Sequence, residues 1–155
     1  MNLVSKEKKI ITQNRKARFN FEIIDKIEVG IVLNGSEVKA IRQNKVSLDS
    51  SYATFKSNEI WIMNLHIDIK NFALGFDSTQ PARPRKILIK RGEIDKISLK
   101  IKNNGYTLVP LDLHFNLKGF IKVLLGISKG RKKHDLREYK KQQDWKRDKE
   151  RLKRI

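Results

Sequence analysis

Basic residues in short clusters are the part of the sequence whose types and spacing could do chemistry. One cluster spans residues 14–18 (NRKAR), a second spans residues 83–86 (RPRK), and Lys39 and Arg42 are spaced three apart. Lys and Arg bind phosphate through charge and hydrogen bonds. Because each cluster adjoins a predicted element, the three could join into one phosphate-binding face. Each cluster alone is equally compatible with an ordinary solvated surface.

Glu28 and the three histidines are the other candidate functional side chains. Glu28 lies between two apolar residues of a predicted strand, where a carboxylate can orient an arginine or accept a hydrogen bond from a base edge. An ordinary exposed glutamate is the alternative. His66 and His114 lack a second ligand at metal-binding spacing, so we expect structural roles for both. His134 lies in the basic run 129–137, where an imidazole either contacts RNA or is merely solvated.

Signatures of the common enzyme classes are missing from the sequence. It has no G-x-S-x-G elbow, no Gly-rich phosphate loop ending in G-K-[ST] and no H-E-x-x-H motif. The chain contains no cysteine, which excludes disulfides, thiolate zinc sites and cysteine nucleophiles. We therefore expect a protein that is not an enzyme and holds no cofactor or metal.

The net charge indicates a polyanionic partner. The 155 residues include 35 Lys or Arg and 17 Asp or Glu, which gives a formal charge of +18 at pH 7. Residues 129–155 hold 13 of these cations and 5 of the anions, a net +8, which leaves +10 on residues 1–128. The chain has no apolar run that would serve as a transmembrane span or a signal peptide. We expect a cytoplasmic protein that makes no membrane contact.

Hydrophobic periodicity predicts a mainly β domain that positions these residues. Alternation predicts strands at residues 19–33, 46–55, 60–67, 106–115 and 120–127. A short helix is expected after the Asn34–Ser36 turn, with Ser36 as its N-cap. A second helix is expected around Ile94–Ile101, ended by the C-cap Asn103-Asn104-Gly105, and a loop is expected at 70–85. Several short strands with one helix before the last pair are typical of an OB-fold-like Greek-key barrel with short helices.

The chain is predicted to divide into a flexible N-terminus, a folded domain and a basic tail, at residues 1–9, 10–128 and 129–155. In a helical tail, Leu136 would lie about half a turn from Trp145, so no continuous apolar seam forms. Ordering costs about 1–2 kcal/mol per residue, and without a seam little offsets that cost. We therefore expect a tail that is disordered when free and that extends roughly 40 Å when it is helical on a polyanion.

Seven short motifs occur in the order in which a known protein family has them. They are residues 14–17 (NRKA), 28–33 (EVGIVL), 35–39 (GSEVK), 83–89 (RPRKILI), 93–94 (EI), 105–111 (GYTLVPL) and 129–137 (KGRKKHDLR). From about residue 10 to 150 the chain thereby resembles the SmpB family of bacterial tmRNA-binding proteins. The resemblance implies an OB-type barrel that binds the tRNA-like domain of tmRNA and supports its aminoacylation and its delivery with elongation factor Tu. It also implies a tail that enters the empty messenger channel of stalled ribosomes, where it becomes helical.

Candidate binding residues follow for two surfaces. The resemblance and the basic clusters together give a tmRNA-binding set: Asn14, Arg15, Lys16, Phe21, Glu28, Lys39, Arg42, Arg83, Arg85, Lys86, Leu88 and Lys90. The tail is implied to contact the decoding centre and messenger channel through Lys129, Gly130, Arg131, Lys132, His134, Asp135, Arg137, Trp145, Lys146 and Arg147. Leu136 stands where the family has a lysine, which removes one cation from the tail.

The expected partners are tmRNA, the small ribosomal subunit and, through the tmRNA complex, elongation factor Tu, with the protein itself a monomer. Two other function classes stay open at this point. A structural ribosomal protein or RNA chaperone with the same barrel would co-purify with all ribosomes. An RNA-processing enzyme would need a metal or an acid–base pair, and the sequence offers neither.

Overall fold

The computed structural model describes residues 8–73, 75, 79–131 and 133–154, with side chains left undescribed at 133–135. This part of the chain contains nine strands and four helices. They are β1 (Lys9–Gln13), α1 (Arg15–Asn20), β2 (Phe21–Ile31), α2 (Gly35–Arg42), β3 (Val46–Ser47), β4 (Tyr52–Lys56), β5 (Glu59–Met63), β6 (His66–Ile67), β7 (Arg85–Leu88), α3 (Arg91–Asn104), β8 (Thr107–Phe115), β9 (Ile121–Gly130) and α4 (Lys133–Lys153).

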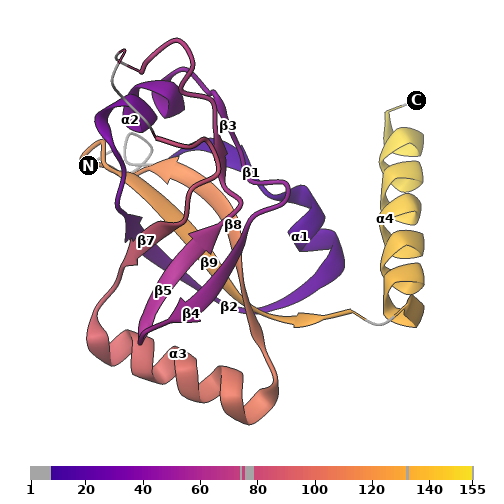
Figure 1. Ribbon diagram of the computed structural model, residues 1–155. Helices are drawn as coiled ribbons and strands as arrows, with labels where there is room; N and C mark the ends of the chain where they lie inside the picture. The colour runs from indigo at the N-terminus through magenta and orange to yellow at the C-terminus, as the bar shows by residue number, and fades with distance from the viewer. Residues whose placement is uncertain (1–7, 74, 76–78, 132, 155) are drawn as a thin grey trace, which may run out of the picture.

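Seven of the strands form one antiparallel sheet in the order β1-β8-β9-β2-β7-β5-β4, and β3 pairs with β6. The sheet curls so that β4 contacts β8, which gives it the form of a barrel (Figure 1). The prediction of a mainly β, OB-fold-like barrel with short helices is thereby confirmed. Buried aliphatic side chains such as Val29, Ile41, Ile62 and Leu125 fill its interior.

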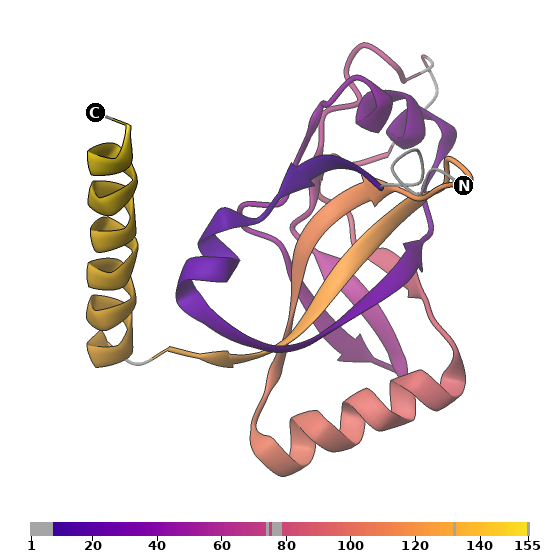
Figure 2. The ribbon, with the colours of Figure 1, turned by 180° about the vertical axis from the view of Figure 1, so that it is seen from behind.

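The helices lie around the barrel rather than inside it. In Figure 1, α2 lies over the upper end of the barrel, α3 crosses the lower end, and α1 and α4 stand to one side; Figure 2 shows the same arrangement from behind. As the sequence predicted, α3 ends at Gly105, which adopts a left-handed φ of 66° and donates its N–H to Ile101 O at 2.9 Å.

Several boundaries differ from the prediction, each for a local reason. The strand predicted from residue 19 begins at Phe21, because the preceding residues form the helix α1, which Asn14 caps at its N-terminus and which extends to Asn20. The N-cap of α2 is Asn34, not Ser36: its side chain and that of Glu37 form a capping box. The two strands predicted at 46–55 and 60–67 are each divided in two by turns, the second at Asn64, which has a φ of 57°.

Two strands, β1 and β7, were not predicted at all. Both are short, and β7 falls where the predicted loop ends. Its first residue, Arg85, is fully buried although it is charged, so hydropathy hides the inward and outward alternation of this strand. Without β7 the sheet could not run from β2 to β5, so the missed strand is essential to the barrel.

In the basic tail, residues Lys133–Lys153 form the helix α4; the disorder expected of the free tail stays a prediction. The predicted boundary at residue 129 lies inside β9, which ends at Gly130. Beyond it, the Tyr139 ring packs edge-on against Phe19 of α1, with a centroid distance of 5.8 Å, and the Arg131 guanidinium lies 4.1 Å from the Tyr139 ring centroid. These contacts attach one turn of α4 to α1, although the helix has no continuous apolar seam.

Candidate RNA-binding surface

Two of the predicted phosphate-binding arginines are part of the structural frame instead. Arg85 is fully buried, and its Nε donates to Glu37 Oε2 at 2.6 Å. Arg83 pairs with the other carboxylate oxygen of Glu37. Burial alone would raise the pKa of Glu37, but hydrogen bonds from Arg83, the Asn34 amide and Arg85 hold that pKa below its ordinary value. The assignment of Arg85 to the RNA-binding set is therefore wrong, because its side chain has no exposed surface, and that of Arg83 stays a prediction.

The first basic cluster is positioned by a buried asparagine. Asn14 is 2% exposed, its Oδ1 accepts from the Ala17 amide at 3.1 Å, and its Nδ2 donates to Pro110 O at 3.0 Å. Asn14 thus caps α1 and attaches it to β8, so its own side chain faces the protein. The helix held in this way leaves Arg15 and Lys16 exposed to a partner.

Phe21 is half-buried beneath the same helix. It packs against the small apolar cluster that contains Ala17, Val109 and Leu111. Phe21 therefore supports α1, and only part of its ring is exposed for contact with RNA.

Residues on the outer face of the barrel form a row across neighbouring strands. Gly30 of β2 pairs with Leu88 of β7 on one side and with Lys122 of β9 on the other. Lys122 in turn pairs with His114 of β8. Residues directly opposite each other in antiparallel strands point to the same face, and Glu28 shares that face because it lies two residues before Gly30.

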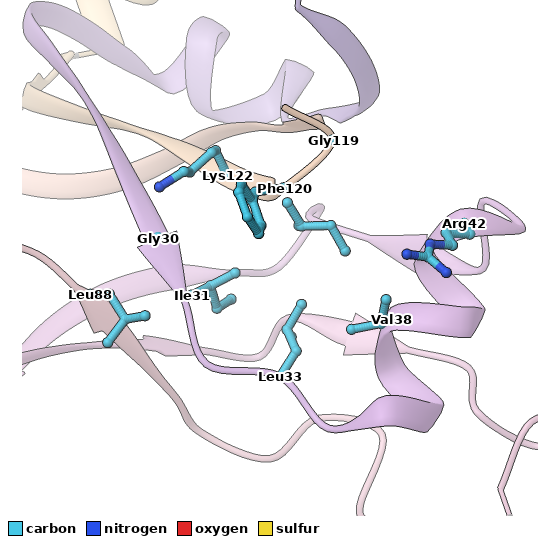
Figure 3. A pocket seen from close by; sticks show the side chains of 10 residues that line it. Gly30, Ile31, Leu33, Val38, Arg42, Leu88, Gly119, Phe120 and Lys122 are labelled. Atoms are coloured by element: carbon cyan, nitrogen blue, oxygen red, sulfur yellow. The ribbon is translucent and has the colours of Figure 1, made fainter. Parts of the chain in front are cut away.

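A groove runs over one end of this row (Figure 3). It has a volume of about 300 Å³ and is lined by residues of β2, the β2–α2 loop, α2, β7, the β8–β9 turn and β9, among them Leu33, Arg42, Leu88, Phe120 and Lys122. Leu88 is 54% exposed and Phe120 is 63% exposed, so the groove combines apolar surface that faces solvent with two cations. Unstacked nucleotides bind to such surfaces, with bases on apolar groups and phosphates on Lys or Arg.

Gly30 leaves the space that this groove needs. A Cβ added at this position would lie 3.1 Å from the Leu88 Cβ, which is closer than ordinary packing. The backbone of β2 can therefore approach β7 while Leu88 projects outward over it. This close approach explains the glycine in a strand whose neighbours Val29 and Ile31 are buried in the core.

A second hollow of about 560 Å³ lies along the same strands, with Lys8, Glu28, His114, Lys118 and Leu124 in its lining. Glu28 is half exposed here, and its Oε1 lies 2.6 Å from His114 Nε2. The structural role expected for His114 agrees with its burial. Sequence reasoning missed that Asp112, two residues earlier on the same strand, also contacts the ring, although a period of two places both residues on one face.

The remaining candidates are spread over the surface. Lys39 on α2 and Lys90 before α3 are exposed. Lys86 forms an exposed ion pair with Glu59 at 2.9 Å. The structure thus brings Glu28, Leu88 and Arg42 to one face, and it adds two residues that were not predicted, Lys122 and Phe120. In the sequence, the polar Lys122 alternates with the apolar Val123 of the same strand, and this alternation could have placed Lys122 on the outer face.

The tail residues lie along α4 or just before it. Lys129 and Gly130 belong to β9, Arg131 contacts Tyr139, and Arg137, Trp145, Lys146 and Arg147 are exposed on the helix. Lys149 lies 5.0 Å from the Trp145 ring centroid. Lys132 and the side chains of His134 and Asp135 fall outside the described residues, so the roles implied for them stay predictions.

Within the described ranges, no three His, Asp or Glu side chains are grouped in a way that could hold a metal ion. None of the helices in the same part of the chain combines the length and hydropathy needed to span a bilayer.

Comparison with known proteins gives a consistent result. The family model described as SmpB protein matches residues 11–155. The SsrA-binding protein of Ehrlichia canis (strain Jake) is 50% identical over 143 residues, which cover 92% of this chain and 96% of that protein. The SsrA-binding protein of Rickettsia bellii (strain OSU 85-389) is also 50% identical, over 145 residues, which cover 94% of this chain and 95% of that protein.

A solved structure described as "tmRNA-SmpB: a journey to the center of the bacterial ribosome" has a similar fold. It superposes with a TM-score of 0.61 at 35% sequence identity, over 82% of this chain and 92% of that chain. Because the family model spans nearly the whole sequence and relatives at 50% identity cover more than nine tenths of it, the chain belongs to the SmpB family.

Proposed function

We propose that this chain binds tmRNA and acts in trans-translation, the rescue of stalled ribosomes. The match to the SmpB family over residues 11–155 is the observation that carries this conclusion. Its relatives are named SsrA-binding proteins, and the similar solved structure is a tmRNA–SmpB assembly on the ribosome.

The outer face of the barrel supports this function physically. It combines the half-exposed carboxylate of Glu28, the apolar side chains of Leu88 and Phe120, and the cations Arg42 and Lys122. A folded RNA with unstacked loops offers groups complementary to all three: base N–H groups, base faces and phosphates. The tRNA-like domain of tmRNA is such an RNA, and its binding by the barrel would support its aminoacylation and delivery.

The tail supports the second half of the proposal. The 21-residue helix α4 carries a high density of cations and is exposed along most of its length. At 1.5 Å per residue it extends roughly 30 Å, which suits a channel lined with ribosomal RNA phosphates. We assign this helix to the empty messenger channel of the small subunit.

Identification of the RNA that accompanies the protein tests the proposal. The full chain is purified from bacterial cytoplasm with and without prior removal of ribosomes, and bound RNA is sequenced. Enrichment of tmRNA in both fractions is expected. Recovery of ribosomal RNA alone, in proportion to all ribosomes, would contradict the proposal and favour a structural ribosomal protein.

The tail assignment is tested with substitutions in the full chain. Replacement of Arg137, Lys146 and Arg147 by alanine should leave affinity for tmRNA within about twofold but reduce tagging of chains on stalled ribosomes. The matched control replaces three exposed lysines away from the tail, at Lys56, Lys96 and Lys102. If both triple variants tag equally well, the tail does not have the assigned role.

A further inference from the structure

Four polar side chains, Lys8, Asp112, His114 and Glu28, contact one another in a row on the outer face of the barrel. Lys8 Nζ lies 3.2 Å from Asp112 Oδ2, Asp112 Oδ1 lies 2.6 Å from His114 Nδ1, and His114 Nε2 lies 2.6 Å from Glu28 Oε1. The side chains of Asp112 and His114 are 2% and 1% exposed, whereas that of Glu28 is 50% exposed. The two buried side chains, Asp112 and His114, therefore lie between the partly exposed Lys8 and the Glu28 carboxylate at the surface.

The imidazole at the centre has little freedom to move. A carboxylate only accepts hydrogen bonds, so both contacts are hydrogen bonds at the same time only when the ring carries a proton on each nitrogen. Rotation of the ring would remove the hydrogen bond to Asp112 Oδ1 inside the protein, where an acceptor without a partner is costly. Lys8 on the far side of Asp112 holds that carboxylate in turn, and Lys122 is the cross-strand neighbour of His114.

We propose that His114, oriented by Asp112, is a positioning residue that fixes the Glu28 carboxylate for contact with RNA. This inference rests on the proposed function, because it assigns a role within the surface that binds tmRNA. Glu28 Oε1 is held by the imidazole, and its second oxygen accepts from an N–H of a base. His114 itself does not touch the RNA.

Positioning matters here because a carboxylate is repelled by RNA phosphates, and it contributes to binding only when it accepts a hydrogen bond from an N–H of a base. A Glu28 side chain that moved freely would bring negative charge close to phosphates. Fixing a free glutamate side chain on binding also costs conformational entropy. The imidazole restrains the side chain before RNA arrives, so this cost falls on folding and not on binding.

A double-mutant cycle on the full-length protein tests the inference. Affinity for the tRNA-like domain of tmRNA is measured at fixed salt for wild type, His114→Leu, Glu28→Ala and the double variant. We expect each single substitution to weaken binding about tenfold, as loss of one charge-assisted hydrogen bond does. The double variant should be no weaker than Glu28→Ala alone, since two residues that act as a unit are not additive.

A conservative variant of His114 distinguishes a positioning role from general support of the fold. His114→Gln keeps a side-chain N–H donor and should recover most of the affinity lost in His114→Leu. If His114→Leu does not fold, as thermal unfolding would show, Asp112→Asn replaces it in the cycle, because this substitution keeps the shape of the side chain and removes the charge that orients the ring. In the free protein, the NMR resonance of the His114 Nε2 proton should shift on Glu28→Gln and not on Glu22→Gln.

The outcomes distinguish this inference from the function on which it rests. If wild type fails to bind the RNA, the proposed function is refuted. If wild type binds and Glu28→Ala weakens binding, but the folded His114 variants bind as wild type does, only the positioning role is refuted. Additive losses in the double variant, or wild-type affinity for Glu28→Ala, would also overturn it.

Discussion

The buried ion pair between Glu37 and Arg85 gives a sharp prediction about stability. Glu37→Gln removes the carboxylate charge while it keeps the size of the side chain. The Arg85 guanidinium then remains fully buried with only carbonyl oxygens as partners, such as Leu65 O and Pro81 O. Loss of one member of a buried pair typically destabilises a protein by about 3–5 kcal/mol.

The expected loss of unfolding free energy can be converted into a shift of Tm. At roughly 2–4 °C of Tm per kcal/mol for a chain of this size class, Glu37→Gln should lower Tm by about 6 °C or more. Urea denaturation followed by circular dichroism measures the free energy of unfolding directly. Glu59→Gln is the matched control, since the Glu59–Lys86 pair is exposed on both sides and pairs of that kind contribute at most about 1 kcal/mol.

The same variants test the reassignment of the arginine cluster from RNA binding to structure. If Glu37→Gln were as stable as Glu59→Gln, the reasoning about the buried pair would be refuted. If Arg83→Ala, measured as folded protein, lost more RNA affinity than a neighbouring surface lysine variant does, the reassignment of that arginine would be refuted instead.

Four further predictions concern acid stability, the groove and the tail. Because the pKa of Glu37 is lower in the folded protein than its ordinary value of 4.5, its stabilising effect is complete above 4.5 and is lost as pH falls below 4.5 and through the lower pKa of the folded protein. Urea midpoints should therefore drop on acidification more for wild type than for Glu37→Gln. Leu88→Ala should weaken RNA binding several-fold, whereas substitution of Leu99, a similarly exposed leucine on α3, by alanine should not. Equal RNA affinities of the two variants would show that the groove is not part of the binding surface. Lys122→Ala should reduce the slope of log affinity against log salt by about 0.7–0.9, as one phosphate contact does. Tyr139→Ala should release α4 from α1 and increase its protease sensitivity, and unchanged digestion would show that the ring contact does not hold the helix.

Sequence reasoning predicted the elements whose periodicity is regular. The helix ending at Gly105 and the last two strands were found because their apolar residues repeat without interruption and glycine supplies the left-handed cap. The family resemblance was also found from the sequence alone, because the order of short motifs can be recognised without knowing which residues are in contact. It led to Glu28 and Leu88, which the structure places on one face with Arg42.

What sequence reasoning missed depends on contacts between distant residues. Arg85 looked like a phosphate ligand because nothing in its local sequence shows that Glu37, 48 residues away, neutralises it inside the protein. Lys122 and Phe120 join the site only when β9 pairs with β2. The contact between α4 and α1 joins a tyrosine to a phenylalanine about 120 residues earlier in the chain.

The most direct test of the central claim is a titration of the full-length protein with the isolated tRNA-like domain of tmRNA. It is repeated with Glu28→Ala and with Glu22→Ala, an exposed glutamate on the same strand. Saturable binding that Glu28→Ala weakens about tenfold and Glu22→Ala leaves unchanged is the predicted result. An absence of binding, or equal affinity for all three proteins, would contradict the proposal that this face of the barrel recognises tmRNA.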